Sequence, residues 1–171
     1  MSPKKQMLRH FLAALAYRTQ KALRGRPPAF DGFRAAPGVR TPHELVWHMS
    51  SVLGYARTHF TGGAWRPRLE PSLDAELVRF HRILEDLRGH LERGTPLRDT
   101  TPERMLQGPF ADAMTHAGQL SMLRRLFGAP VPPENFIVAD VDGANVGAGQ
   151  PAPVSPDEVW HAAEDEPRGT D

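Results

Sequence analysis

The chain has 171 residues, of which 40% are hydrophobic, and this is enough for one globular domain with a substantial core. Its 21 Lys and Arg residues balance 20 Asp and Glu residues, so the net charge of +1 gives no overall field that would recruit nucleic acid or an anionic membrane. Cysteine is absent, which excludes disulfides, thiolate ligands and a cysteine nucleophile, and any thiol must therefore arrive as a substrate. No apolar run approaches the roughly 18 residues that span a bilayer and no secretory signal is visible, so we expect a cytoplasmic protein.

The first expected helix covers residues 3–24 and follows a Ser2-Pro3 start. Its polar face carries six cationic residues and no acidic one. Basic amphipathic segments of this kind also occur in transit peptides and in surface-binding helices. We interpret this one as a core-forming helix whose basic face is balanced by the acidic residues from Glu134 onward, and its apolar stripe comprises Met7, Leu8, Phe11, Leu12 and Leu15.

A connection rich in Pro and Gly leads to the second expected helix, at residues 41–60. Thr41 and Glu44 have the spacing of a capping box, which marks the beginning of this helix. His48 lies at the edge of its apolar arc and therefore points at least partly inward. His59 is three turns further along, so one metal ion cannot bind both histidines at a rise of about 1.5 Å per residue.

The third expected helix begins at Ser72 and ends at Gly94. His81 borders its apolar stripe, where it is either an outer-shell group of a site or a half-exposed edge residue. A short helical turn at residues 100–103 follows, and the Gly108-Pro109 pair interrupts it before the next helix begins.

The fourth expected helix covers residues 109–127 and ends at Gly128. His116 lies near the centre of its apolar arc, and Asp112 lies one turn earlier at the edge of the same arc. Two ligands at positions i and i+4 of a helix can reach one ion, as the zinc-binding His pair of the HExxH motif does. The helix therefore offers a carboxylate and an imidazole to a common point.

If the second and fourth helices pack with these faces together, His48, Asp112 and His116 meet as a set of two histidines and one carboxylate. Such a set leaves coordination positions open for water or substrate, which is a catalytic rather than a structural pattern. Two alternatives remain at this point. A histidine at the edge of an apolar face is often a hydrogen-bonded core residue, and Asp112 is also placed to interact with a helix dipole.

The segment Asp112–Arg124, together with Glu44–His48, resembles the DinB-like superfamily of small bacterial metalloproteins. Those proteins often carry His-x-x-x-His-Arg-Gly-Gln on the later helix and a single histidine on the second helix. In this chain His116 and Gln119 match that pattern, and so does His48. Asp112 stands where many members have His, and the harder carboxylate ligand leaves the identity of the metal open.

The resemblance extends over residues 5–150 and implies an all-α fold, a four-helix bundle in an up-down-down-up arrangement. It also implies a homodimer and a divalent metal ion, which we expect to be zinc, nickel, manganese or iron. We expect one domain at residues 1–171, with the bundle at residues 3–128 and a C-terminal wrap and tail at residues 129–171. In this last part, residues 135–142 are too short and β-branched for another long helix.

We expect the C-terminal segment to wrap back across the bundle and to place Phe136, Ile137 or Trp160 over a mouth of the site. Ser155 and Glu158 have the spacing of a second capping box and predict a short helix around Trp160. The alternative is a disordered tail, which we expect for the last seven residues.

These observations lead us to expect a metal-dependent enzyme that acts on a small molecule. The metal would activate a bound thiol or a bound water molecule. Because some members of the similar family transfer thiols, we expect thiol S-transfer as the first candidate reaction and hydrolysis as the second. Glu44 lies one turn before His48 and could orient its imidazole or act as a general base. Gln119 could hydrogen-bond a ligand or the substrate.

Two other classes of function remain open. One is a non-catalytic, dimeric binding or stress-response protein with a structural or vestigial metal site. The other is an iron oxygenase, which the two-histidine, one-carboxylate ligand set alone would allow but which the bundle fold disfavours.

Overall fold

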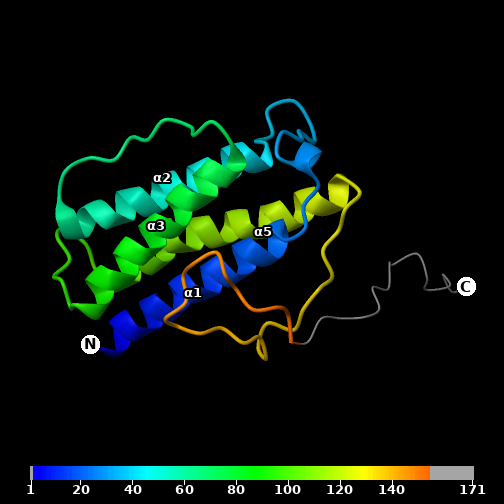
Figure 1. Cartoon of the computed structure of the whole chain (residues 1–171). Coiled ribbons are helices and arrows are strands. Elements are labelled where there is room, and N and C mark those ends of the chain that lie inside the picture. The colour runs from blue at the N-terminus through cyan, green and yellow to red at the C-terminus, as the bar shows by residue number, and fades with distance from the viewer. Residues whose placement is uncertain (1, 155–171) are drawn as a thin grey trace, which may run out of the picture.

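The computed structural model describes residues 2–154, and these residues form an all-α fold without a strand, as the sequence predicts (Figure 1). Short turns of 3-10 helix at Pro28–Phe30 and of π-helix at Leu106–Phe110 complete the helical elements. Within the described residues, no helix combines the length and the apolar character that a membrane crossing requires. The five α-helices are α1 (Pro3–Leu23), α2 (Pro42–Thr61), α3 (Leu73–Glu92), α4 (Pro102–Met105) and α5 (Ala111–Leu126).

The predicted capping residues begin the three helices on which they were recognised. The Ser2 hydroxyl accepts a hydrogen bond from the Lys5 amide at the start of α1, and the Ser72 hydroxyl does the same at the start of α3. At α2, Thr41 and Glu44 form a complete capping box, in which each side chain accepts a hydrogen bond from the backbone N–H of the other. The beginnings of these helices are therefore fixed by local hydrogen bonds.

The interruption expected before α5 is a kink within a continuous helical path. Gly108 has non-helical backbone angles (φ −93°, ψ −107°), and Pro109 lies inside the π-helical turn that joins α4 to α5. Proline lacks an N–H and its ring clashes with the preceding turn, so the α-helical hydrogen-bond ladder cannot pass through this point. The kink leaves Asp112 in the first turn of α5.

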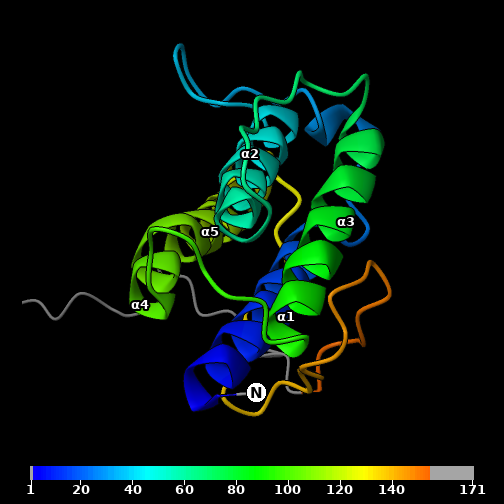
Figure 2. The same cartoon turned by 90° about the vertical axis from the view of Figure 1, so that its left-hand side faces the viewer.

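The long helices enclose one apolar core, in which α1 and α2 each pack against both α3 and α5 (Figures 1 and 2). Lys5 at the start of α1 donates to the carbonyl oxygen of Gly94, just beyond the end of α3. Arg124, near the end of α5, donates to the carbonyl oxygen of Ala22, near the end of α1. The largest fully buried side chains include Tyr17, Phe30, Phe80, Phe110 and Met49.

The segment that follows α5 lies along α1 and α3 and is held by hydrogen bonds (Figure 2). The Tyr17 hydroxyl donates to the Glu134 carboxylate over 2.5 Å, and Lys21 donates to the Pro132 carbonyl oxygen over 2.7 Å. Burial and the Glu134 carboxylate raise the pKa of Tyr17, so its hydroxyl remains a donor. The segment therefore contacts α1 and α3, as far as the described residues extend.

The expected position of Phe136 and Ile137 over a mouth of the site is wrong. Phe136 packs edge-on against Tyr17 and lies under the guanidinium of Arg18, both on α1, and Ile137 is 89% exposed. The hydrogen bonds to α1 direct the segment to this side of the molecule because the basic face of α1 attracts Glu134 and backbone carbonyl oxygens. Trp160 and its predicted helix lie outside the described residues.

The contact between the C-terminal segment and α3 depends on the protonation of His81. Nδ1 of His81 lies 2.8 Å from the carbonyl oxygen of Val146, so this nitrogen carries the proton. Nε2 is buried and has no hydrogen-bond partner among the described residues. Burial lowers the pKa of His81, because a second proton would place a charge in this apolar surrounding.

We therefore predict that the protein loses stability as the pH falls from about 7 toward 5. In this range His81 of the unfolded chain, with an ordinary pKa of about 6.5, takes up a proton. His81 of the folded protein has a lower pKa and stays neutral, so acid favours the unfolded state. The His81→Asn variant keeps a side-chain N–H donor but does not titrate. Urea unfolding at pH 7.5 and pH 5.5 should show a smaller loss of unfolding free energy for this variant than for the wild type. Equal losses in the two proteins would contradict the assignment.

Candidate metal centre

The structure brings together the three residues that the sequence predicts as metal ligands. Nε2 of His116 lies 3.3 Å from one carboxylate oxygen of Asp112, and Nε2 of His48 lies 3.4 Å from the other. The two imidazole rings are nearly perpendicular, with their centroids 4.7 Å apart. One potential ligand atom from each residue lies within 4.8 Å of the other two, so the set could hold a metal ion.

Helix geometry explains why these side chains converge. Asp112 and His116 are four residues apart on α5, so they lie on one face of that helix. His48 reaches the same point from α2, which packs directly against α5. The His116 side chain is buried, whereas those of His48 and Asp112 are 25% and 44% exposed. Asp112 is thus the most exposed member of the cluster and His116 the most buried.

Gln119 determines which nitrogen of His116 carries a proton. Its Oε1 lies 2.7 Å from Nδ1 of His116, so Nδ1 donates and Nε2 keeps its lone pair. That lone pair faces an oxygen of Asp112, which is also an acceptor, so only a cation or an added proton makes this contact favourable. A hydrogen bond at the second ring nitrogen is also the usual support of a metal-binding histidine.

His48 also presents a neutral ring. Burial chiefly, and then the positive charge of Arg40, lower the pKa of His48, and the Asp112 carboxylate only partly offsets them. At neutral pH the ring is therefore predominantly uncharged, as a metal-binding imidazole must be. A bound metal ion would compensate the Asp112 carboxylate between the two rings.

The chemical types of the donors suit a small divalent ion. The two short distances run from His116 and His48 to different oxygens of Asp112, and one ligand atom from each residue lies within 4.8 Å of the others. Two imidazoles and a carboxylate are acceptable to zinc, nickel, manganese and iron alike, so the donor set does not select one of them. Three protein ligands leave room for water or substrate.

Glu44, the other predicted catalytic residue, is engaged at the start of α2. Its carboxylate accepts a hydrogen bond from the Thr41 amide over 2.7 Å and pairs with Arg34 at 3.0 Å. The hydrogen bond from Thr41 chiefly, and the Arg34 guanidinium next, lower the pKa of Glu44. These contacts make it a weak proton acceptor, and its role as a general base stays a prediction.

Two hollows flank the cluster. The first ends at His116 and Gln119 and has a volume of about 520 Å³. The second, of about 560 Å³, is wide and open and includes Asp112 and Tyr55. Sequence reasoning missed the first hollow, because much of its lining comes from the irregular segment before α2, which has no periodicity to interpret. In the sequence, the feature of that segment that could have pointed to a binding site is Arg40, a cationic residue directly before the capping box of α2.

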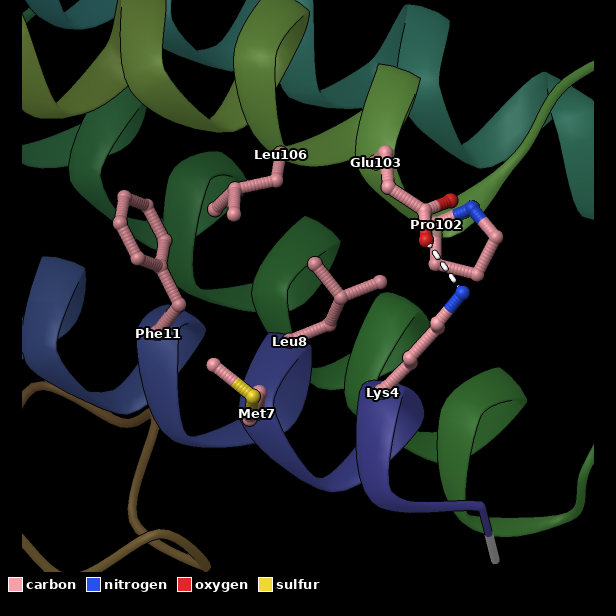
Figure 3. Close-up of a pocket in the computed structure, with 7 residues that line it drawn as sticks. All are labelled: Lys4, Met7, Leu8, Phe11, Pro102, Glu103 and Leu106. Atoms are coloured by element: carbon pink, nitrogen blue, oxygen red, sulfur yellow. Dashed lines mark ion pairs between the residues drawn. The ribbon is translucent and has the colours of Figure 1, made fainter.

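A third hollow lies between the start of α1 and α4 and contains none of the three candidate ligands (Figure 3). Met7, Leu8, Phe11 and Leu106 give it an almost entirely apolar lining. An ion pair of 2.5 Å between Lys4 and Glu103 lies at its rim, and this pairing holds the pKa of Glu103 at about 2. It offers no ligand set for a metal ion.

No model of a protein family, no curated protein and no solved structure matches this chain. The resemblance to the DinB-like superfamily therefore remains a prediction from the motif residues.

The cluster predicts that the purified protein carries about one equivalent of a divalent metal or takes it up on reconstitution with zinc, nickel, manganese or iron. The variants His48→Ala, Asp112→Ala and His116→Ala should lose stoichiometric metal, because each removes one of three ligands. Gln119→Ala should retain a site that is about 10- to 100-fold weaker, since only the orientation of His116 is lost. Elemental analysis after dialysis measures the stoichiometry, and competition with a chelator measures the affinity.

His59→Ala is the matched control, because His59 lies on the same helix as His48 but binds the carbonyl oxygen of Arg98 instead. It should keep the metal content of the wild type. A folded His116→Ala protein that still holds one equivalent of metal would overturn the assignment, with circular dichroism verifying the fold.

Proposed function

We propose that this chain is a metal-dependent enzyme that acts on a small molecule, with a divalent cation bound by His48, Asp112 and His116. The observation that supports this most directly is the convergence of two imidazoles and a carboxylate within 4.8 Å, with Gln119 at Nδ1 of His116. With the His116 proton on Nδ1, Nε2 and the Asp112 oxygen meet as two acceptors, and a bound cation would make this contact favourable.

A divalent cation bound there would supply Lewis acidity and lower the pKa of a thiol or water molecule. The chain itself lowers the pKa of His48 and directs the Nε2 atoms of both imidazoles toward Asp112. The 44% exposure of Asp112 leaves that side accessible to a reactant. Because the chain has no cysteine, a reacting thiol must come from solution. We therefore place transfer of a small thiol first and hydrolysis second.

Glu44 acts in this proposal as a positioning residue. Its carboxylate closes the capping box at the start of α2 and also binds Arg34 of the preceding connection. Both contacts fix the first turn of the helix that carries His48, one turn further on. Gln119 has the same kind of role for His116, since it contacts the ring rather than the open side of the cluster.

We also propose that the four long helices form an up-down-down-up bundle of the DinB-like kind, and that the protein is a homodimer in the cytoplasm. Hydrogen bonds between helix ends support the bundle order. Lys5 links the start of α1 to the end of α3, Arg124 links the ends of α5 and α1, and the amide of Arg98 links the region after α3 to His59 near the end of α2. With these ends adjacent, α2 and α3 run in one direction and α1 and α5 in the other.

The thiol proposal predicts that cobalt(II)-loaded protein changes its visible and near-ultraviolet absorption when L-cysteine or 2-mercaptoethanol is added, because sulfur becomes a ligand. With 1-chloro-2,4-dinitrobenzene as a probe electrophile, a C–S bond forms, the C–Cl bond breaks, chloride leaves and the thiol proton passes to solvent. The rate should exceed that of metal-free protein at least about tenfold.

His59→Ala should behave as the wild type, and His116→Ala as the metal-free protein. If the thiol leaves the absorption spectrum unchanged but the loaded protein hydrolyses 4-nitrophenyl acetate, the hydrolase form of the proposal is the correct one. Metal binding without either activity would reject the enzyme and favour a binding protein.

A further inference from the structure

The hollow that is lined by His116 and Gln119 has several exposed apolar side chains in its wall. Leu45 and Leu123 form a buried part of its lining, and its outer part contains Val39, Met122 and Leu126. These three side chains are 37%, 62% and 60% exposed, respectively. Apolar side chains that gather around one concave site, rather than lying singly on the surface, mark a place where a ligand or partner covers them.

This wall leads directly to the candidate metal centre. His116 and Gln119 line the same hollow, and both come from the helix face that also carries Met122 and Leu123. A molecule that fills the hollow therefore has one part against apolar side chains and another next to the cluster. Its volume of about 520 Å³ is within the range of about 300–1,000 Å³ that is typical of small-molecule sites.

Arg40 is the cationic residue in this lining. It is exposed and forms no ion pair or side-chain hydrogen bond within the described part of the chain, whereas Arg26 and Arg34 of the same connection pair with Asp31 and Glu44. Its charge lies close enough to His48 to oppose protonation of that ring. An anionic group that entered the hollow would thus meet a guanidinium that has no competing carboxylate.

We infer that this hollow binds a small molecule with an apolar body and a carboxylate, with the body against Met122 and Leu126 and the carboxylate on Arg40. The inference deepens the proposed function by naming its substrate class, and to that extent it rests on that function. Binding itself depends only on the apolar wall and on Arg40, so it does not require the metal. A small molecule fits better than a protein surface because the hollow is concave and ends at His116 and Gln119.

The test compares 4-phenylbutanoate with 4-phenylbutan-1-ol, which has the same apolar body and no charge. Calorimetric titration of metal-free and zinc-loaded protein gives the affinity for each probe. The carboxylate should bind about tenfold more tightly than the alcohol in both forms, as one charge-assisted contact would provide. Arg40→Gln should abolish the preference for the carboxylate while leaving the affinity for the alcohol unchanged. Met122→Glu should lower the affinity for both probes.

Arg104→Gln is the matched control, because Arg104 is an exposed arginine that does not line this hollow. It should retain the wild-type preference. Equal affinity for the two probes, or a preference that survives Arg40→Gln, would overturn the inference. So would a change in oligomeric state caused by Met122→Glu, measured by light scattering, since the wall would then be an interface between chains.

The two proposals fail in different ways. A carboxylate preference that depends on Arg40 in protein that takes up no metal would support the ligand class and reject the metal-dependent enzyme. Stoichiometric metal in protein that binds neither probe would leave the metal centre standing and reject the ligand class.

Discussion

Asp112 stands between two imidazoles, and this contact sets the chemical character of the molecule. The Nδ1 proton of His116 is held by Gln119, so its Nε2 lone pair faces Asp112, and burial and the charge of Arg40 lower the pKa of His48. A cation among these side chains would make the contact between His116 and Asp112 favourable. Since His48 is on α2 and the other two residues are on α5, a bound cation would also stabilise the packing of these two helices.

The kink before α5 bears on an alternative explanation of Asp112. A carboxylate in the first turn of a helix is often explained by the helix dipole alone. Here the backbone is non-helical at Gly108, shortly before α5, and Phe110 supplies no side-chain cap. Asp112 instead contacts both imidazoles. Its contacts therefore favour a role in the cluster over a role as a helix cap.

Much of the fold and the meeting of the three candidate ligands could be predicted from the sequence, because both depend largely on local rules. The capping residues at Thr41 and Ser72 act within one turn, and the approach of Asp112 to His116 follows from helical spacing. The position of His48 needed one further assumption, that α2 packs on α5.

The errors and omissions concern irregular segments, whose positions depend on contacts between residues far apart in sequence. Phe136 lies on α1 because Glu134 and neighbouring carbonyl oxygens meet Tyr17 and Lys21, more than 100 residues away. No periodicity in the sequence indicates such a pairing. Arg40 was missed for a similar reason, because its importance comes only from the hollow that its segment forms with α5.

The position of the cluster between two hollows bears on the choice between transfer and hydrolysis. One hollow is lined by His116, Arg40 and several apolar side chains, whereas the other includes Asp112 and is more open to water. Hydrolysis needs access for one organic substrate, since water is present everywhere. A transfer reaction needs access for two reactants that meet at one point without displacing each other. A cluster that can be approached from two sides, in a chain that has no thiol of its own, meets the second requirement and therefore favours transfer.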